Sequence, residues 1–413
     1  MAAAPNFLLP RVSALALRGL RLLARYHVAV LVLCWLGVQV VSWHVNHSPH
    51  AYGDSVHYLD YAHQIAEQGN FVKVHYTRYI GYPLFLSAFL KVGLGRTAMA
   101  LGQYAVAGVA TVALYRAVRR LGRGAWEPAF LATLLYIGWS DIQRFNAFLL
   151  TESLFTSLLL LSFWAVARVR TVGSGALALL VLLITVSVRP NGFVALVAAA
   201  LALAVVVQQR GPRRLKWLVL GAALLLLPVA WTALNQLLLT FQLIKTYREG
   251  MIIFMYDGIL MHPTGPLALP APDATPVERL AYFILHNPRY FGQLAIWKLI
   301  FFMGFPKPYF SALHIFWQFM TLPLVYWLAL RGLAYRFVAR PMRVFLAAGF
   351  VVQAGIITLT IEDYDIRFSG PVLPYVFALA TLGALPLWRR AQQWLEKSSH
   401  PSLIAEVSEG ESR

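Results

Sequence analysis

Long apolar segments recur along the whole chain and constrain its fold more than any other feature. They lie near residues 28–43, 80–95, 97–115, 127–139, 152–167, 175–188, 192–207, 217–235, 290–304, 312–330, 344–360 and 370–388. Continuous runs of this length are typical of helices in a membrane rather than of the short alternating strands of an outer-membrane barrel. With 59% hydrophobic and 13% charged residues, a chain of 413 residues has too little polar surface for water. The sequence therefore predicts an all-α polytopic membrane protein.

The distribution of charge predicts which segments cross the membrane. If all twelve cross, the arginines of residues 116–123 face outside, against the tendency of basic residues to stay on the cytoplasmic side. If segments 80–95 and 290–304 instead lie in the interface, about ten helices cross and both termini are cytoplasmic. The inner segments then hold 22 of the 35 Lys and Arg residues, and the outer segments hold 12 of the 17 Asp and Glu residues. The outer acids suggest chemistry on the outer face.

The chain is expected to form one transmembrane domain over residues 1–390, followed by a polar, flexible cytoplasmic tail over 391–413. Two outer loops, 44–96 and 236–311, are long enough to indicate a functional role. The arginines before residue 28 precede the first apolar segment without a small-residue cleavage site, which favours a retained signal anchor. We attribute the net charge of +18 to basic residues in the cytoplasmic loops. Nucleic-acid binding is not indicated, because the sequence contains no basic aromatic platform for it. Cys34 is the only cysteine, which excludes intrachain disulfides.

The first outer loop contains an amphipathic helix that begins near Asp54. Apolar residues recur at helical spacing between positions 58 and 66, polar residues fill the opposite face, and Gly69 ends the helix. Asp54 is a preferred type of N-cap residue, and its carboxylate can also accept a proton in catalysis. His57 and Tyr58, one turn later, are candidates to support the acid.

An aromatic turn follows in residues 77–90. Arg78 stands before a Gly–Pro turn and an apolar helix, and Arg78 and Tyr82 are candidates for ligand binding. The alternative is an interface anchor, in which Tyr79 and Tyr82 belong to the aromatic belt and Arg78 snorkels to the surface.

Ionisable residues stand at three further outer positions. Glu152 opens an apolar helix, where it either benefits from the helix dipole or orients an active-site arginine or the acceptor. Arg189 lies in the outer turn R-P-N-G, where it either snorkels or binds an anion. Arg367 is a candidate to bind phosphate, although Asp363 and Asp365 could simply neutralise it.

Two lysines in the second half of the chain, Lys298 and Lys307, are candidates to bind phosphate. Lys298 interrupts the apolar stretch I-W-K-L-I-F-F, which suits an interfacial helix better than a span, because a lysine inside the bilayer is costly. Lys307 lies in the stiff turn F-P-K-P-Y-F. Both are expected near the outer surface, where they would meet either a substrate phosphate or lipid headgroups.

No cofactor is indicated by the sequence. His44, His47 and His50 have a spacing that could hold a metal on a helix, but zinc would need a fourth ligand, and histidine is ordinary at an interface. We therefore expect no metal, with a divalent ion as the alternative. Because the chain has neither a G-x-x-x-x-G-K loop nor G-x-G-x-x-G, nucleotide sugars and ATP are poor donor candidates.

Five short motifs occur in a characteristic order. They are G-D-S-x-x-Y at 53–58, R-Y-I-G-Y-P-L-F-L at 78–86, L-T-E-S-L-F at 150–155, S-V-R-P-N-G at 187–192 and I-R-F-S-G-P-V-L-P at 366–374. In this order the chain resembles the GT-C glycosyltransferases, in particular bacterial members akin to the protein O-mannosyltransferases and the aminoarabinose lipid A transferases. The resemblance covers about 50–200 and returns near 360–380.

The resemblance implies a GT-C-like bundle of about ten transmembrane helices, with juxtamembrane helices in the outer loops. It also implies a reaction: the transfer of a sugar from a polyprenyl phosphate to a lipid, glycan or protein acceptor on the extracytoplasmic face, with no required cofactor. By motif position, Asp54 is the catalytic base. Many relatives carry a second acid after it, whereas this chain has Ser55, which puts any role for two adjacent acids in doubt.

This chemistry needs a base for the acceptor hydroxyl and cations for the leaving phosphate. Asp54 can act as the base, and the resemblance makes Arg367 the first choice of cation, ahead of Arg78, Arg189 and the two lysines. A single displacement inverts the anomeric centre, as in inverting glycosidases.

Two other functions stay open at this point. One is a transporter or flippase of lipid-linked sugars, and the other is a non-catalytic subunit of an envelope complex. Transporters typically show paired repeats and ionisable residues near the bilayer midplane, and the sequence shows neither. The enzyme hypothesis places the chain in a bacterial inner membrane, with membrane lipids and the lipid-linked sugar as partners and without nucleic acid.

Overall fold

The structure is a computed structural model that describes residues 8–69, 71, 76–239, 243–254 and 256–399. Over these residues the chain is helical, with isolated β-bridges and no strand. Six helical segments are long and apolar enough to cross a membrane by length and composition. The chain is therefore an all-helical polytopic membrane protein, which confirms the predicted fold class.

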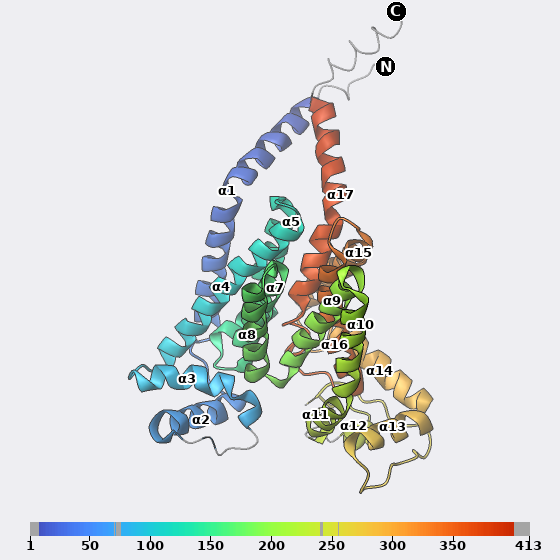
Figure 1. The fold of residues 1–413 in the computed structure, drawn as a ribbon. Helices are drawn as coiled ribbons and strands as arrows, with labels where there is room; N and C mark the ends of the chain where they lie inside the picture. The colour runs from blue at the N-terminus through green and yellow to red at the C-terminus, as the bar shows by residue number, and fades with distance from the viewer. Residues whose placement is uncertain (1–7, 70, 72–75, 240–242, 255, 400–413) are drawn as a thin grey trace, which may run out of the picture.

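The six long segments account for most of the bundle shown in Figure 1. They are α1 (Leu8–Val45), α4 (Arg96–Leu121), α9 (Phe193–Arg210), the pair α10 (Arg213–Leu225) and α11 (Leu227–Leu239), α15 (Ala312–Ala334) and α16 (Arg340–Leu359). Four more helices lie among them: α5 (Trp126–Gly138), α7 (Thr151–Arg168), α8 (Val172–Val188) and α17 (Leu373–Ser399). All ten segments expected to cross are thus helical, but only six meet the length and hydropathy needed to span on their own.

The bundle has two distinct ends. At one end α1 begins and α17 finishes, and this is named the terminal end (Figure 1). Helix α17 continues to Ser399, beyond the boundary at 390 predicted for the tail, and residues 400–413 lie outside the described residues. The opposite end, named the loop end, carries the short helices of the two long connections.

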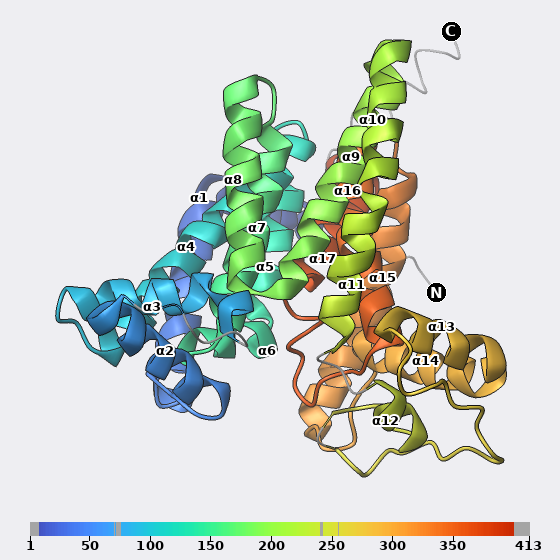
Figure 2. The same cartoon turned by 60° about the horizontal axis from the view of Figure 1, so that its bottom comes forward.

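The loop end has two groups of short helices, which Figure 2 shows side by side below the bundle. The first group is α2 (Asp54–Gln68), η1 (Tyr76–Tyr79) and α3 (Gly81–Lys91), and the second is α12 (Leu243–Arg248), α13 (Pro276–His286) and α14 (Pro288–Phe302). Between them lie α6 (Ser140–Gln143), η2 (Arg144–Ala147) and η3 (Pro190–Gly192). With 11 and 15 residues, α3 and α14 are shorter than the roughly 20 residues of a span, as is α5 with 13 residues. The place of α3 and α14 in the interface stays a prediction.

Close packing joins the first group to the bundle. The apolar face of α2 buries Tyr58, Leu59 and Ala62 against α3, as the amphipathic pattern predicts. Helix α3 begins where the chain meets the end of α8, and a Cβ on Gly81 would lie 2.4 Å from the Ser187 hydroxyl. Glycine is therefore needed here for the two helices to approach, and this contact places α2 beside the residues that follow α8.

Candidate active site

Asp54 is the first residue of α2, and its carboxylate faces a cation. Its Oδ2 accepts a hydrogen bond of 3.1 Å from Nη2 of Arg367, and the side chain is 51% exposed. The N-cap of α2 is Gly53, with a φ of 54° that favours glycine. The alternative that Asp54 serves as the N-cap is therefore wrong in the structure, because the cap position is already occupied and the carboxylate is paired elsewhere.

Glu152 is the buried centre of the same group. It lies in the first turn of α7, its side chain is fully buried, and its Oε1 accepts hydrogen bonds from Nη1 of Arg189, at 2.8 Å, and from Nε of Arg367. A buried carboxylate is tolerated when cations and hydrogen bonds compensate its lost hydration. Glu152 thus stands in the first turn of α7 and pairs with two arginines, while its role in an active site stays a prediction.

Arg189 is fixed by the turn that ends α8. Its backbone is extended, with a φ of −151°, because Pro190 follows and the helix cannot continue. The guanidinium lies 5.8 Å from the ring of Phe155 and 5.4 Å from the ring of Phe368. These rings exclude water from one side, and cation–π attraction adds to the ion pair with Glu152. Arg189 is thus held inside the protein instead of reaching out to the interface.

Arg367 connects the buried acid to the exposed one. It lies in the connection between α16 and α17 and donates to both Glu152 and Asp54. The pKa of Arg367 is raised above its ordinary value, mainly by the charge of Glu152, so the guanidinium is permanently charged. Asp363 and Asp365, which the sequence offered as its neutralising partners, form no ion pair with Arg367 among the described residues.

These four residues are named the Asp54 cluster. They come from four segments far apart in the sequence, and their formal charges cancel. Side-chain exposure increases from 0% at Glu152 to 9% at Arg189, 22% at Arg367 and 51% at Asp54. The cluster therefore begins inside the bundle and opens to the surface at a carboxylate and a guanidinium.

Backbone contacts place the first outer loop against the segment between η2 and α7. The His50 N–H donates to the Ala147 carbonyl at 3.0 Å, and the Leu149 N–H donates to the His50 carbonyl at 2.9 Å. His50 thus forms a bridge four residues before Asp54, and its partners lie just before Glu152. This short pairing brings the two acids of the cluster to the same place.

Lys298 and Lys307 lie inside the protein, contrary to the expectation of surface positions. Lys298 is fully buried on α14, donates to the Thr360 carbonyl at 2.5 Å, and lies 4.7 Å from the Tyr247 ring. Burial lowers the pKa of Lys298 to about 7. The expected surface position is therefore wrong for this lysine, because Tyr247 of α12 and Thr360 at the end of α16 lie against its ammonium.

Lys307 binds the connection that carries Arg367. It is 1% exposed, lies 3.4 Å from Oε1 of Glu362, and donates to the carbonyls of Asp363, Tyr364 and Asp365. Its ammonium therefore closes a loop instead of facing the surface, which corrects the second lysine prediction. Lys307 and Glu362, with these carbonyls, are named the Lys307 cluster.

Glu362 is the acid of the Lys307 cluster and also joins the second long connection. Burial raises the pKa of Glu362 to about 8, and the Lys307 charge opposes this shift only in part. The Glu362 backbone pairs with residues 252–254 through hydrogen bonds of 3.2 and 2.7 Å. The α16–α17 connection is thus held from both sides, which fixes the position of Arg367.

Sequence reasoning missed another pair at the same connection. Arg144 of η2 forms an ion pair with Asp365, and Tyr309 stacks on Tyr364 with ring centroids 4.1 Å apart. Asp365 was considered only as a partner of Arg367. The charge pattern alone could not distinguish the two arginines, since η2 has no distinctive sequence signal.

The aromatic candidates lie under α2. Tyr82 is fully buried, and its hydroxyl donates to Oε1 of Gln103 at 2.6 Å, so it belongs to the core and is neither a surface ligand nor an interface anchor. Tyr58 is 3% exposed, and its ring contacts those of Tyr79 and Tyr82. Tyr58 supports α2 by packing, while His57 is exposed on the same helix.

Arg78 lies on η1 and is partly buried, directly before Tyr79. Its ligand-binding role stays a prediction. For the proposed histidine site, His50 packs against the rings of Tyr52 and Phe148. Over the described ranges, no group of three or more His, Cys, Asp and Glu side chains could hold a metal ion.

The Asp54 cluster combines a carboxylate that can accept a proton with a cation that can bind an anion. The half-exposed carboxylate can accept a proton from a hydroxyl, and the adjacent guanidinium can bind phosphate through parallel hydrogen bonds. The acid and the cation approach from α2 and from the α16–α17 connection, so a substrate between these segments would meet both.

Comparison with known proteins does not assign the chain to a family. No family model matches the sequence, and no curated protein matches it. Among solved structures, the chain is similar to the crystal structure of ArnT from Cupriavidus metallidurans in the apo state, with 13% sequence identity and a TM-score of 0.45. The similarity covers 87% of this chain and 61% of ArnT, so the chain spans about three-fifths of that protein.

Proposed function

We propose that this chain is an inverting glycosyltransferase that moves a sugar from a polyprenyl-phosphate donor to a hydroxyl acceptor at the loop end. The observation that carries the proposal is the Asp54 cluster, in which an exposed carboxylate lies 3.1 Å from a guanidinium that a buried acid holds in place. The order of the five sequence motifs supports the same reaction. The loop end would be the extracytoplasmic face, with the basic terminal end in the cytoplasm.

In the proposed reaction, the acceptor oxygen attacks the anomeric carbon as Asp54 takes its proton. The bond from the anomeric carbon to the phosphate oxygen breaks, and the phosphate leaves with the electron pair. Arg367 stabilises the charge that develops on this oxygen, and Arg189 adds positive potential from the buried part of the cluster. One displacement inverts the configuration of the sugar, and no metal is needed because the arginines bind the phosphate.

The contact between Asp54 and Arg367 suggests how the donor enters. An ion pair that is partly exposed to solvent contributes only about 0–1 kcal/mol, so a phosphate can replace it. When phosphate takes over Arg367, the Asp54 carboxylate loses its partner and can accept a hydrogen bond from the acceptor hydroxyl. Glu152 keeps Arg367 in position during this exchange. Donor binding and release of the Asp54 carboxylate are therefore coupled through one guanidinium.

The test is turnover by the purified protein in lipid, offered a panel of polyprenyl-phosphate sugars and crude envelope acceptors. Mass spectrometry would follow the release of free polyprenyl phosphate. We expect Asp54→Asn to abolish release, since an amide is not a base at neutral pH. Asp60→Asn is the matched control, because Asp60 is an exposed acid on the same helix, and it should keep full turnover.

Each outcome of this assay is informative. Equal release by Asp54→Asn and wild type would overturn the role of Asp54. Movement of intact donor across the bilayer without release would favour a flippase, and an envelope defect that Asp54→Asn complements would favour a scaffold.

A chelator should leave turnover unchanged. Loss of turnover with the chelator, and its recovery with a divalent ion, would contradict the metal-free reaction.

A further inference from the structure

A large cavity lies between α1 and α4, away from the Asp54 cluster. Its volume is about 710 Å³, within the usual range for ligand sites. Val28, Val32 and Leu36 of α1 and Val112 of α4 line its walls, and each is about half exposed. Since both helices have the length and composition of membrane spans, these side chains would face the hydrocarbon of a bilayer.

Gly108 shapes one wall of this cavity. A Cβ at this position would lie 3.2 Å from two ring atoms of Trp35, so the indole rests directly against the α4 backbone. The Trp35 indole N–H is buried and has no hydrogen-bond partner in the described structure. The part of the wall formed by Trp35 and Gly108 is therefore closely packed.

Three arginines line the cavity toward the terminal end. Arg116, Arg119 and Arg120 lie within two turns of α4, and all are exposed. The lining contains no acidic residue, and none of the three forms an ion pair among the described residues. Like charges three and four residues apart repel each other on a helix. An anion bound at this end would remove that repulsion.

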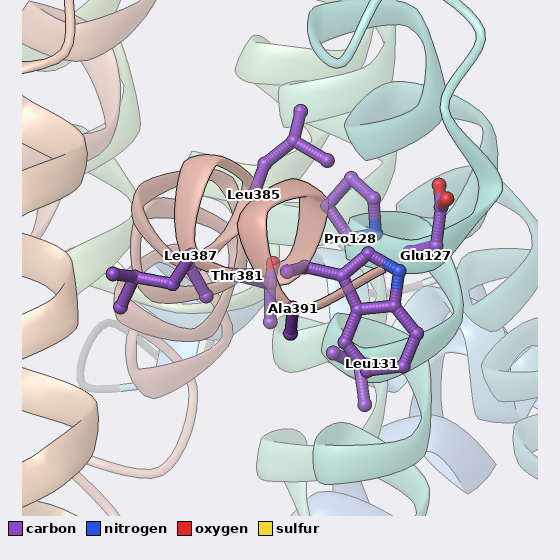
Figure 3. Close-up of a pocket in the computed structure, with 9 residues that line it drawn as sticks. Glu127, Pro128, Leu131, Thr381, Leu385, Leu387 and Ala391 are labelled. Carbon is purple, nitrogen blue, oxygen red and sulfur yellow. The ribbon is translucent and has the colours of Figure 1, made fainter. Parts of the chain in front are cut away.

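A second cavity at the terminal end provides a contrast. It has a volume of about 270 Å³ between α5 and α17. Figure 3 shows Glu127 and Pro128 on one side and Thr381, Leu385 and Ala391 on the other. Its only charged lining residue is Glu127, so it does not suit an anion. The combination of apolar walls and clustered arginines therefore distinguishes the cavity between α1 and α4.

We propose that the groove between α1 and α4 binds an anionic diacyl phospholipid from the leaflet on the side of the terminal end. Its acyl chains would lie along Val28, Val32 and Val112, and its phosphate would meet Arg116, Arg119 and Arg120. Basic pockets between transmembrane helices on the cytoplasmic side suit such headgroups. A polyprenyl-phosphate donor does not fit this orientation, because in the proposed reaction its phosphate binds Arg367, which pairs with Asp54 at the start of α2. Helix α2 lies at the opposite end of the bundle (Figure 1).

The experiment is native mass spectrometry of the full chain, released from vesicles that contain equal amounts of phosphatidylglycerol and phosphatidylcholine. Wild type should retain one phosphatidylglycerol in preference to phosphatidylcholine. The triple variant Arg116→Gln, Arg119→Gln and Arg120→Gln should lose this preference by tenfold or more. The matched control carries Arg213→Gln, Arg214→Gln and Lys216→Gln on α10, a basic group that lines neither cavity, and it should behave like wild type.

A second variant separates a specific groove from a general attraction of basic loops to anionic lipid. Val112→Trp fills the groove and keeps every charge, and we expect it to release the bound lipid. Retention of phosphatidylglycerol by both groove variants, or equal loss in the α10 control, would overturn the proposal. Replacement of the bound lipid by one equivalent of polyprenyl phosphate would also overturn it and assign the groove to the donor. Because Asp54→Asn should retain the lipid, failure here is distinguishable from failure of the transferase proposal.

Discussion

The two charge clusters at the loop end contain the same kinds of groups but differ in their access to solvent. In the Asp54 cluster, exposure increases outward from Glu152 to Asp54, which is 51% exposed. In the Lys307 cluster both ionisable side chains are at most 1% exposed, and the ammonium is surrounded by loop carbonyls. The first arrangement leaves groups for a ligand, whereas the second stabilises a connection. Charge type alone did not separate these roles, and burial does.

The largest effect on stability is expected at the buried carboxylate of the Asp54 cluster. Glu152→Gln leaves Arg189 and Arg367 without their shared counter-charge, and removal of one partner of a buried ion pair costs about 3–5 kcal/mol. We expect a large fall in the apparent Tm in detergent. Asp54→Asn is the matched control, since it makes the same carboxylate-to-amide change at the exposed end. Equal Tm values for the two variants would show that Glu152 is not the centre of the cluster.

The Lys307 cluster can be tested through pH. The folded-state pKa of Glu362, about 8, lies above its ordinary value of 4.5, so folding retains a proton that the unfolded chain releases. The corresponding stability is fully present below about pH 4.5 and is lost as the pH rises to 8, at up to about 1.4 kcal/mol per pH unit.

We therefore expect the apparent Tm of the wild type to fall from pH 5 to pH 7, and the fall to be smaller in Glu362→Gln. Above pH 7 the buried Lys298 acts in the opposite direction, because its pKa of about 7 lies below its ordinary value. The same amide substitution at the exposed Glu249 serves as the control. If the Tm of Glu362→Gln depended on pH as steeply as that of wild type, Glu362 would be ionised in the folded protein.

The smallest effect on stability is expected at Asp54 itself. Its carboxylate is half exposed, and such ion pairs contribute about 0–1 kcal/mol. Asp54→Asn should therefore unfold within a few degrees of wild type, as measured by thermal denaturation in detergent. A loss comparable to that of Glu152→Gln would show that Asp54 is a structural residue and would remove the distinction between the two clusters.

The helices could be predicted from the sequence far better than the positions and partners of the charged side chains between them. Apolar runs and basic loops determine the bundle locally, and the amphipathic pattern from Tyr58 onward located α2. Asp54, Glu152, Arg189 and Arg367 were all candidates, and the structure brings them together. Their mutual contacts could not be predicted, because they depend on the His50 bridge and on the close approach at Gly81.

The errors share one physical cause. Lys298 and Lys307 were expected at the surface because lysine is rarely buried without a partner. Their partners are backbone carbonyls and a glutamate that lie 55 to 62 residues further along the chain. Burial of this kind depends on the tertiary fold of two long connections and has no local sequence signal. The pairing of Arg144 with Asp365 was missed for the same reason.

The central claim is that donor phosphate replaces Asp54 as the partner of Arg367. The most direct measurement is the Kd of polyprenyl phosphate for wild type and Asp54→Asn, by titration in nanodiscs. If the two anions compete for one guanidinium, the variant should bind the lipid phosphate several-fold more tightly while transferring no sugar. Weaker binding by Asp54→Asn, with its fold intact, would contradict the exchange and place the phosphate elsewhere.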